Sequence, residues 1–128
     1  MSNILVIDDE TGLRNVLGDI LTAEGHRVVL ASGGDEGFKL FANESFDLIV
    51  TDIVMGNGEG LETITKIRKD DKVIPIIAIS GGGRVPGNVY LGLASRLGAD
   101  WTFCKPFDVP EFVDAVNRFS RSSGGITK

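Results

Sequence analysis

Five polar residues lie at the ends of short apolar runs. They are the carboxylates Asp8, Asp9 and Asp52, the hydroxyl of Ser80 and the ammonium group of Lys105. Three carboxylates brought together repel one another, so they need a cation to stay ionised. Hard oxygen ligands with space left for water suit Mg²⁺. The residue types therefore indicate a magnesium site with a further cation and a hydroxyl beside it.

Phosphoryl transfer has a use for every one of these groups. One carboxylate can attack phosphorus and form an acyl phosphate. The transferred group carries charge on its equatorial oxygens, which need a cation, a hydroxyl donor and close backbone amides. Mg²⁺, Lys105, Ser80 and the amide of Gly81 can supply them. The set indicates a site that accepts or releases phosphate.

The apolar runs must form one sheet for these residues to meet. Four of the five runs are nearly continuous and rich in β-branched residues, as expected for strands covered on both faces. The runs are 4–7, 28–30, 48–50, 74–79 and a weaker one at 101–104.

Helical patterns alternate with these strands, with apolar residues three and four positions apart. Their stripes are Leu13, Val16, Leu17, Ile20 and Leu21; Phe38 and Phe41; Leu61, Ile64 and Ile67; Tyr90, Leu93, Ala94 and Leu97; and Phe112, Val113, Val116 and Phe119. Gly98 is placed to end the fourth helix, and Asp108 is expected to cap the fifth with its side chain. The alternation predicts an α/β fold with a parallel sheet, helices on both faces, and ligand chemistry at the carboxyl ends of the strands.

Composition limits the class of protein. A chain of 128 residues fits one domain, and its net charge of −5 without a basic stripe argues against direct nucleic-acid binding. Cys104, the one cysteine, cannot form an internal disulfide. No apolar run reaches the length that inserts into a membrane. We expect a soluble cytoplasmic domain over residues 1–122, followed by a flexible tail at 123–128.

Five motifs at these strand ends together resemble the response-regulator receiver family. They are Leu5-Val6-Ile7-Asp8-Asp9-Glu10; Asp52-Ile53-Val54-Met55 with Gly60 eight residues after Asp52; Ile79-Ser80-Gly81; Gly98-Ala99-Asp100; and Lys105-Pro106-Phe107. The resemblance covers roughly residues 3 to 122 and is to a single-domain, chemotaxis-regulator-like receiver. It implies a doubly wound, flavodoxin-like (βα)5 three-layer sandwich with strand order 2-1-3-4-5.

The resemblance also implies a metal site and a phosphate acceptor. Asp52 looks like the phosphoacceptor, supplied by a sensor histidine kinase or a histidine phosphotransfer protein. Asp8 and Asp9 look like the acidic pair that binds Mg²⁺, together with Asp52 and the backbone carbonyl of Val54. Such a domain catalyses only its own phosphorylation and dephosphorylation, and it controls a separate, unidentified partner through its fourth helix, fifth strand and fifth helix.

Further expectations concern the switch. Ser80 looks like the hydroxyl that moves toward the phosphoryl group, and the Lys105-Pro106 peptide is expected to be cis. Thr102 stands where the family usually has Tyr or Phe, directly after Trp101. The segment 81–87 is longer than the family's usual loop and should be mobile.

Simpler interpretations and other functions stay open. Asp8 and Asp9 could cap a helix, although their company at the strand ends favours the metal site. Trp101 fits the core edge and a partner contact equally well. A Mg²⁺-dependent aspartyl phosphatase uses similar residues, but it commonly has a second Asp where this chain has Val54. A binding module that works without phosphorylation is the third candidate.

Overall fold

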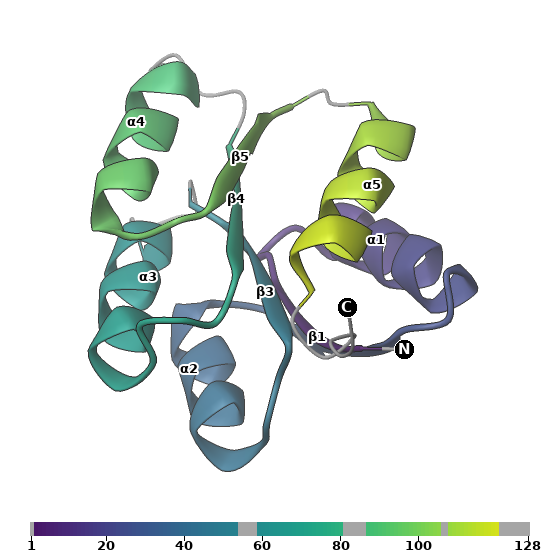
Figure 1. The fold of residues 1–128 in the computed structure, drawn as a ribbon, viewed down its shortest axis with the longest axis horizontal. Coiled ribbons are helices and arrows are strands. Elements are labelled where there is room, and N and C mark those ends of the chain that lie inside the picture. Colours follow the sequence, from purple (N-terminus) through teal and green to yellow (C-terminus); the bar gives the residue numbers. More distant parts are fainter. Residues whose placement is uncertain (1, 54–58, 81–86, 106–107, 121–128) are drawn as a thin grey trace.

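The computed structural model describes residues 2–53, 59–80, 87–105 and 108–120. Strands and helices alternate along the chain as β1 (Asn3–Ile7), α1 (Thr11–Ala23), β2 (Arg27–Ala31), α2 (Gly34–Asn43), β3 (Leu48–Asp52), α3 (Glu59–Asp70), β4 (Ile76–Ser80), α4 (Gly87–Leu97), β5 (Trp101–Cys104) and α5 (Val109–Phe119). The strands form one parallel sheet in the order β2-β1-β3-β4-β5 (Figure 1). The predicted fold class and strand order are confirmed.

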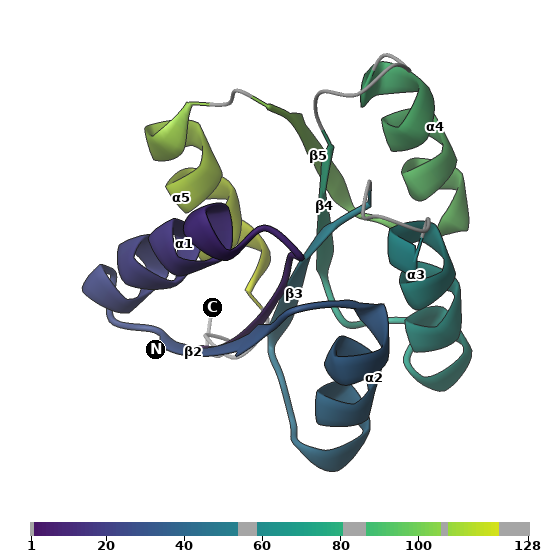
Figure 2. The same cartoon turned by 180° about the vertical axis from the view of Figure 1, so that it is seen from behind.

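Helices cover both faces of the sheet and give three layers. α1 and α5 lie on one face, and α2, α3 and α4 lie on the other (Figures 1 and 2). Side chains of a strand alternate between faces, so Ile4 and Val6 pack with Leu17 and Phe112 in one core. Leu5 and Ile7 pack in the second core with Ile64, Ile67 and Ala94.

The three inner strands are covered as predicted, and the second strand is not. All residues of β3 and β4 are buried, as are four of the five residues of β1. β2 lies at the sheet edge, where Val28 and Val29 are half-buried and Leu30 is 36% exposed. The prediction that this run is covered on both faces was wrong, although the strand order 2-1-3-4-5 that the resemblance implies already places it at the edge.

The helix boundaries follow the predicted pattern, with local corrections. Gly98 ends α4 with φ +123°, and its N–H donates to the carbonyl of Ala94. Asp108 stands at the N-cap of α5, but its side chain makes no capping hydrogen bond. Val16 is 51% exposed, and Leu93 and Leu97 are 43% and 38% exposed. These three side chains lie at the margins of their apolar stripes, which periodicity alone does not show.

Several expectations fall outside what the structure describes. These are the carbonyl of Val54, the 81–86 segment, the Lys105-Pro106 peptide, the Tyr90 side chain and the tail at 123–128. Within the described ranges, no helix is long and apolar enough to cross a membrane.

Candidate functional site

The parallel strands deliver the predicted residues to one edge of the sheet. β1 and β3 are in register with Ile7 opposite Thr51, so Asp8 and Asp52 follow at the same level. Ser80 ends β4 opposite Cys104, and the N–H of Lys105 donates to the Ser80 carbonyl at 2.7 Å. Backbone pairing between neighbouring strands therefore fixes the backbone positions from which these side chains extend.

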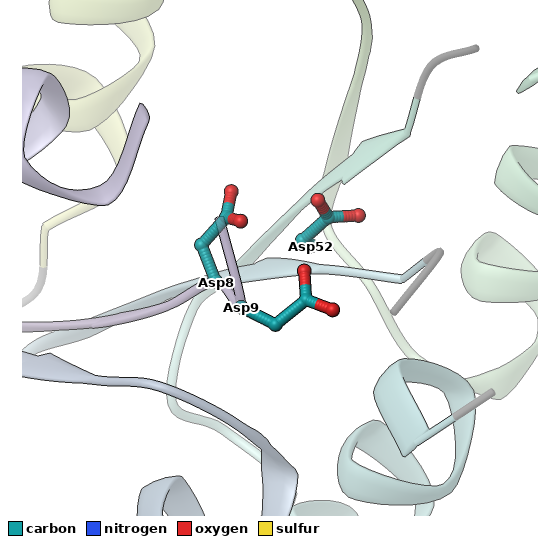
Figure 3. Close-up of side chains that lie close together, drawn as sticks. All are labelled: Asp8, Asp9 and Asp52. Carbon is teal, nitrogen blue, oxygen red and sulfur yellow. The ribbon is translucent and has the colours of Figure 1, made fainter. Parts of the chain in front are cut away.

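Three carboxylates form a cluster at this edge. One oxygen from each of Asp8, Asp9 and Asp52 lies within 4.8 Å of the others. Figure 3 shows them gathered at the ends of β1 and β3. Asp8 is 1% exposed and Asp52 is 4% exposed, whereas Asp9 is exposed. The cluster is therefore closed by the protein on one side and open to solvent on the other.

Lys105 holds the two buried carboxylates. Its Nζ donates to Asp52 Oδ2 at 2.9 Å and lies 3.9 Å from Asp8 Oδ2. Burial by itself lowers the pKa of Lys105, but the hydrogen bond and charge of Asp52 outweigh it and raise the pKa above its ordinary value. The ammonium is therefore charged and partly neutralises the carboxylate cluster.

The carboxyl of Asp8 is only half satisfied by the protein. Its Oδ1 accepts the N–H of Glu10 at 2.8 Å. Its Oδ2 is buried without a hydrogen-bond partner among the described residues. Burial, assisted by the nearby charge of Asp52, raises the pKa of Asp8 to about 6. An unpartnered oxygen beside two further carboxylates is the donor set that a hard divalent cation prefers, so these residues fit Mg²⁺.

The helix-cap interpretation of Asp8 is not supported. Helix α1 has Glu10 at its N-cap, without a capping side-chain bond. The Asp8 side chain binds the Glu10 amide, which precedes the helix, and the Asp8 carbonyl accepts from Arg14 Nη1 at 2.8 Å. Arg14 thus holds the turn between β1 and α1, a role that the sequence patterns did not indicate.

The two predicted switch residues lie at different depths. Ser80 is fully buried, and its Oγ lacks a hydrogen-bond partner in the described part of the chain. Thr102 pairs with Ala78, two residues before β4 and β5 end. It is half-buried and stands below the edge that carries the carboxylates.

Gly60 places helix α3 against the backbone of the site. A Cβ added at this position would stand 2.3 Å from Ile53 Cα and 2.4 Å from the carbonyl oxygen of Asp52. Only glycine allows this approach. The sequence offered Gly60 as part of a motif, and the structure supplies its physical reason.

Fold and site together define a three-layer α/β domain with an acidic, lysine-bridged cluster at the carboxyl edge of its sheet. Residues 4–117 match the response regulator receiver domain family. The chain belongs to this family. Receiver domains act in phosphorylation-based two-component signalling, bind Mg²⁺ at an acidic pocket, and are switches, not classical enzymes. They receive phosphoryl groups from histidine kinases or phosphotransfer proteins.

Individual relatives agree with this assignment. The transcriptional regulatory protein GlrR of Escherichia coli K12 is 31% identical over 126 residues, but the chain spans only 28% of its length. The sporulation initiation phosphotransferase F of Bacillus subtilis is 28% identical over 116 residues, which is 91% of each chain.

Solved structures show the same fold. A receiver domain protein from Clostridium thermocellum has a TM-score of 0.83 at 28% identity, with 92% of this chain and 93% of that chain covered. The response regulator TrrA of Thermotoga maritima, solved in complex with Mg²⁺-BeF, has a TM-score of 0.81 at 33% identity, with 93% and 99% covered.

Proposed function

We propose that the chain is a phosphorylation-dependent switch in which Asp52 accepts a phosphoryl group from a phosphohistidine. The observation that carries this proposal is the contact between Lys105 Nζ and Asp52 Oδ2 at 2.9 Å, beside the cluster with Asp8 and Asp9. A charged lysine beside the Asp52 carboxylate offsets its negative charge and also attracts a phosphoryl group.

The transfer uses the chain's own groups at defined atoms. A carboxylate oxygen of Asp52 attacks phosphorus as the bond from phosphorus to the donor's imidazole nitrogen breaks, and that nitrogen keeps the electron pair. Bound Mg²⁺, held by Asp8, Asp9, Asp52 and the Val54 carbonyl, would neutralise charge on the equatorial oxygens. The Lys105 ammonium would contact another of these oxygens, and the Ser80 hydroxyl would donate a hydrogen bond to the phosphoryl group.

A partly apolar groove beside this edge of the sheet is where a donor protein would bind. A groove of about 350 Å³ between α1 and α5 is lined by Glu10, Leu13, Val16, Lys105 and Val109, among others. Val16 and Val109 are 51% and 44% exposed. Apolar side chains exposed next to the reacting group suit a protein carrying the phosphohistidine better than a small phosphodonor.

The output would pass to a separate protein. Phosphate at Asp52 would draw Ser80 toward it and alter the face formed by α4, β5 and α5. Ser80 and Thr102 are the proposed switch residues, because both belong to the β4–β5 pair that leads from the site to this face. Residues 1–122 would form the receiver domain, and the segment 123–128 would be a tail.

Intact mass spectrometry tests phosphate acceptance. The full chain is incubated with acetyl phosphate and Mg²⁺, and the variants are Asp52→Asn and, as a matched control, Asp70→Asn at the exposed end of α3. We expect wild type and Asp70→Asn to gain one phosphoryl group, and Asp52→Asn and samples with EDTA to gain none. A full-sized adduct in Asp52→Asn would refute the assignment of the acceptor.

The same experiment separates the alternative functions. Continuous release of phosphate from small phosphoesters, over many turnovers, would favour the aspartyl phosphatase. Absence of an adduct both with acetyl phosphate and with a phosphorylated histidine phosphotransfer protein would favour a module that binds without phosphorylation. The proposed switch requires a stable adduct with slow, single-turnover loss.

A further inference from the structure

A second pocket lies on the α1–α5 face of the sheet, away from the acidic cluster. It has a volume of about 190 Å³ between β5 and α5. Its aromatic wall consists of Trp101 and Phe103, which share one face of β5, and Phe119 from α5. Ring centroids are 5.3 Å apart for Trp101–Phe119 and 6.4 Å apart for Trp101–Phe103. Trp101 remains 41% exposed despite these contacts.

Acidic side chains form the other wall of this pocket. Glu111 and Asp114 line it from successive turns of α5 and are exposed. Arg118 follows Asp114 by four residues, a spacing that favours an ion pair on a helix. In the part of the chain that the structure describes, neither acid forms an ion pair with it. The pocket thus combines an exposed indole with two carboxylates that form no ion pair with a described cation, although Arg118 also lines it.

The geometry points to a binding site for a guanidinium group, the side chain of an arginine carried by a partner protein. A cation is attracted by the face of an indole, and more strongly when carboxylates stand beside the ring. Guanidinium fits better than ammonium because it is planar, stacks on aromatic rings and binds carboxylates through two hydrogen bonds. The chain's net charge of −5 would also steer a basic segment toward it.

The pocket would define the chemistry of the output partner of the proposed switch, because that partner would present an arginine side chain. Its use as an output contact rests on the proposed function, whereas arginine binding itself does not. Trp101 directly precedes Thr102, a proposed switch residue, and pairs with Ile77 in the register of β4 and β5. A partner seated on Trp101 would therefore touch the strand through which the acceptor site is expected to act.

Intrinsic fluorescence reports on this pocket directly, because Trp101 is the only tryptophan of the chain. The full chain is titrated with N-acetyl-arginine-N-methylamide, and the matched probe is the citrulline compound, which has the same shape without the charge. We expect a saturable change with the arginine probe at a dissociation constant on the order of 10 mM, because exposed cation–π and ion-pair contacts are weak. The citrulline probe should bind at least about 5-fold more weakly.

Variants separate a local site from general attraction by charge. Glu111→Gln with Asp114→Asn should weaken arginine binding at least about 5-fold, and Arg118→Gln should tighten it by removing a competing cation. The control, Asp35→Asn with Glu62→Gln, removes the same charge from α2 and α3, on the opposite face (Figure 1). It should leave binding unchanged.

Three results would each overturn the inference. They are equal responses to the arginine and citrulline probes, equal losses in the pocket variant and the control variant, and no fluorescence change with the arginine probe. Asp52→Asn should bind the arginine probe like wild type. A failure of phosphate acceptance, read by mass, is therefore distinguishable from a failure of the pocket.

Discussion

Replacing Gly60 by alanine should disturb the proposed acceptor site without touching a side chain of that site. The new Cβ would stand 2.3 Å from Ile53 Cα and 2.4 Å from the carbonyl oxygen of Asp52, both backbone atoms. Ordinary contact begins at 3.4 Å, so α3 and the end of β3 must separate by about 1 Å, and a packed interior resists such shifts.

The magnitude follows from two opposing effects. Overpacking of this kind costs about 1–3 kcal/mol, and alanine recovers up to about 1 kcal/mol of helix propensity over glycine. We expect a net loss of about 1–2 kcal/mol in the free energy of unfolding. A displacement of about 1 Å at a reacting group can slow its reaction up to about 100-fold, so phosphate acceptance at Asp52 should suffer more than stability does.

Urea unfolding measures the first effect, and the rate of adduct formation with acetyl phosphate measures the second. Gly92→Ala in α4 is the matched control, because a Cβ there meets nothing within 4 Å. It should stabilise the protein by about 0.5–1 kcal/mol and leave the acceptance rate unchanged. The reasoning fails if Gly60→Ala gains stability like Gly92→Ala, or if it accepts phosphate at the wild-type rate.

Four further predictions concern the charges and hydrogen bonds around the site. The pKa of Asp8 is raised to about 6, so the Mg²⁺-dependent rise in Tm should be present above about pH 7 and disappear as the pH falls through about 6. Without Mg²⁺, this carboxyl should make the fold less stable as the pH rises from about 4 to about 6. The reason is that the folded state keeps a proton that the unfolded state releases. Lys105→Gln should bind Mg²⁺ about 10-fold more tightly, since a nearby positive charge is lost, while adduct formation slows; calorimetry and mass spectrometry report the two effects. Ser80→Ala should raise the free energy of unfolding of the ligand-free protein by about 1 kcal/mol, seen as a higher urea midpoint, because it removes a buried hydroxyl that has no hydrogen-bond partner among the described residues. Arg68→Met should lower the unfolding free energy by about 3 kcal/mol, because Arg68 donates to three main-chain carbonyls near the ends of α3, β4 and α4 that would lose their donor.

The sequence predicts well which residues lie at the carboxyl ends of the strands, because strand ends are local features. Asp8, Asp52 and Ser80 each stand where a buried run stops, and parallel pairing brings such points together whatever the details of the helices. Lys105 follows from the same rule. These residues could be assigned to one site before any coordinates, since the prediction needed only the order of the strands.

Features that depend on packing across the fold could not be predicted. Val16 fits a helical stripe, but its exposure depends on how α5 lies against α1. Arg68 is an ordinary charged residue of α3 in the sequence. In the structure it donates to the carbonyl of Gly98 and to the carboxylate of Asp100, 30 and 32 residues away. The pocket at Trp101 likewise needs two elements. The sequence left that residue open between core edge and partner contact, and the structure packs it against Phe103 and Phe119 with 41% of its surface exposed.

The unsatisfied atoms of the site indicate how phosphate could move the fold. Among the described residues, Asp8 Oδ2 and Ser80 Oγ are the buried side-chain polar atoms without a hydrogen-bond partner, whereas a carboxylate away from the site, that of Asp71, accepts two amides. Each unpartnered atom costs about 1–3 kcal/mol. Under the proposed function, Mg²⁺ and the phosphoryl group would supply the missing partners, so the phosphorylated state would recover about 2–6 kcal/mol that the ligand-free state lacks. A difference of that size shifts a two-state equilibrium about 30- to 25,000-fold, and it would act through Ser80, at the end of the strand that pairs with β5.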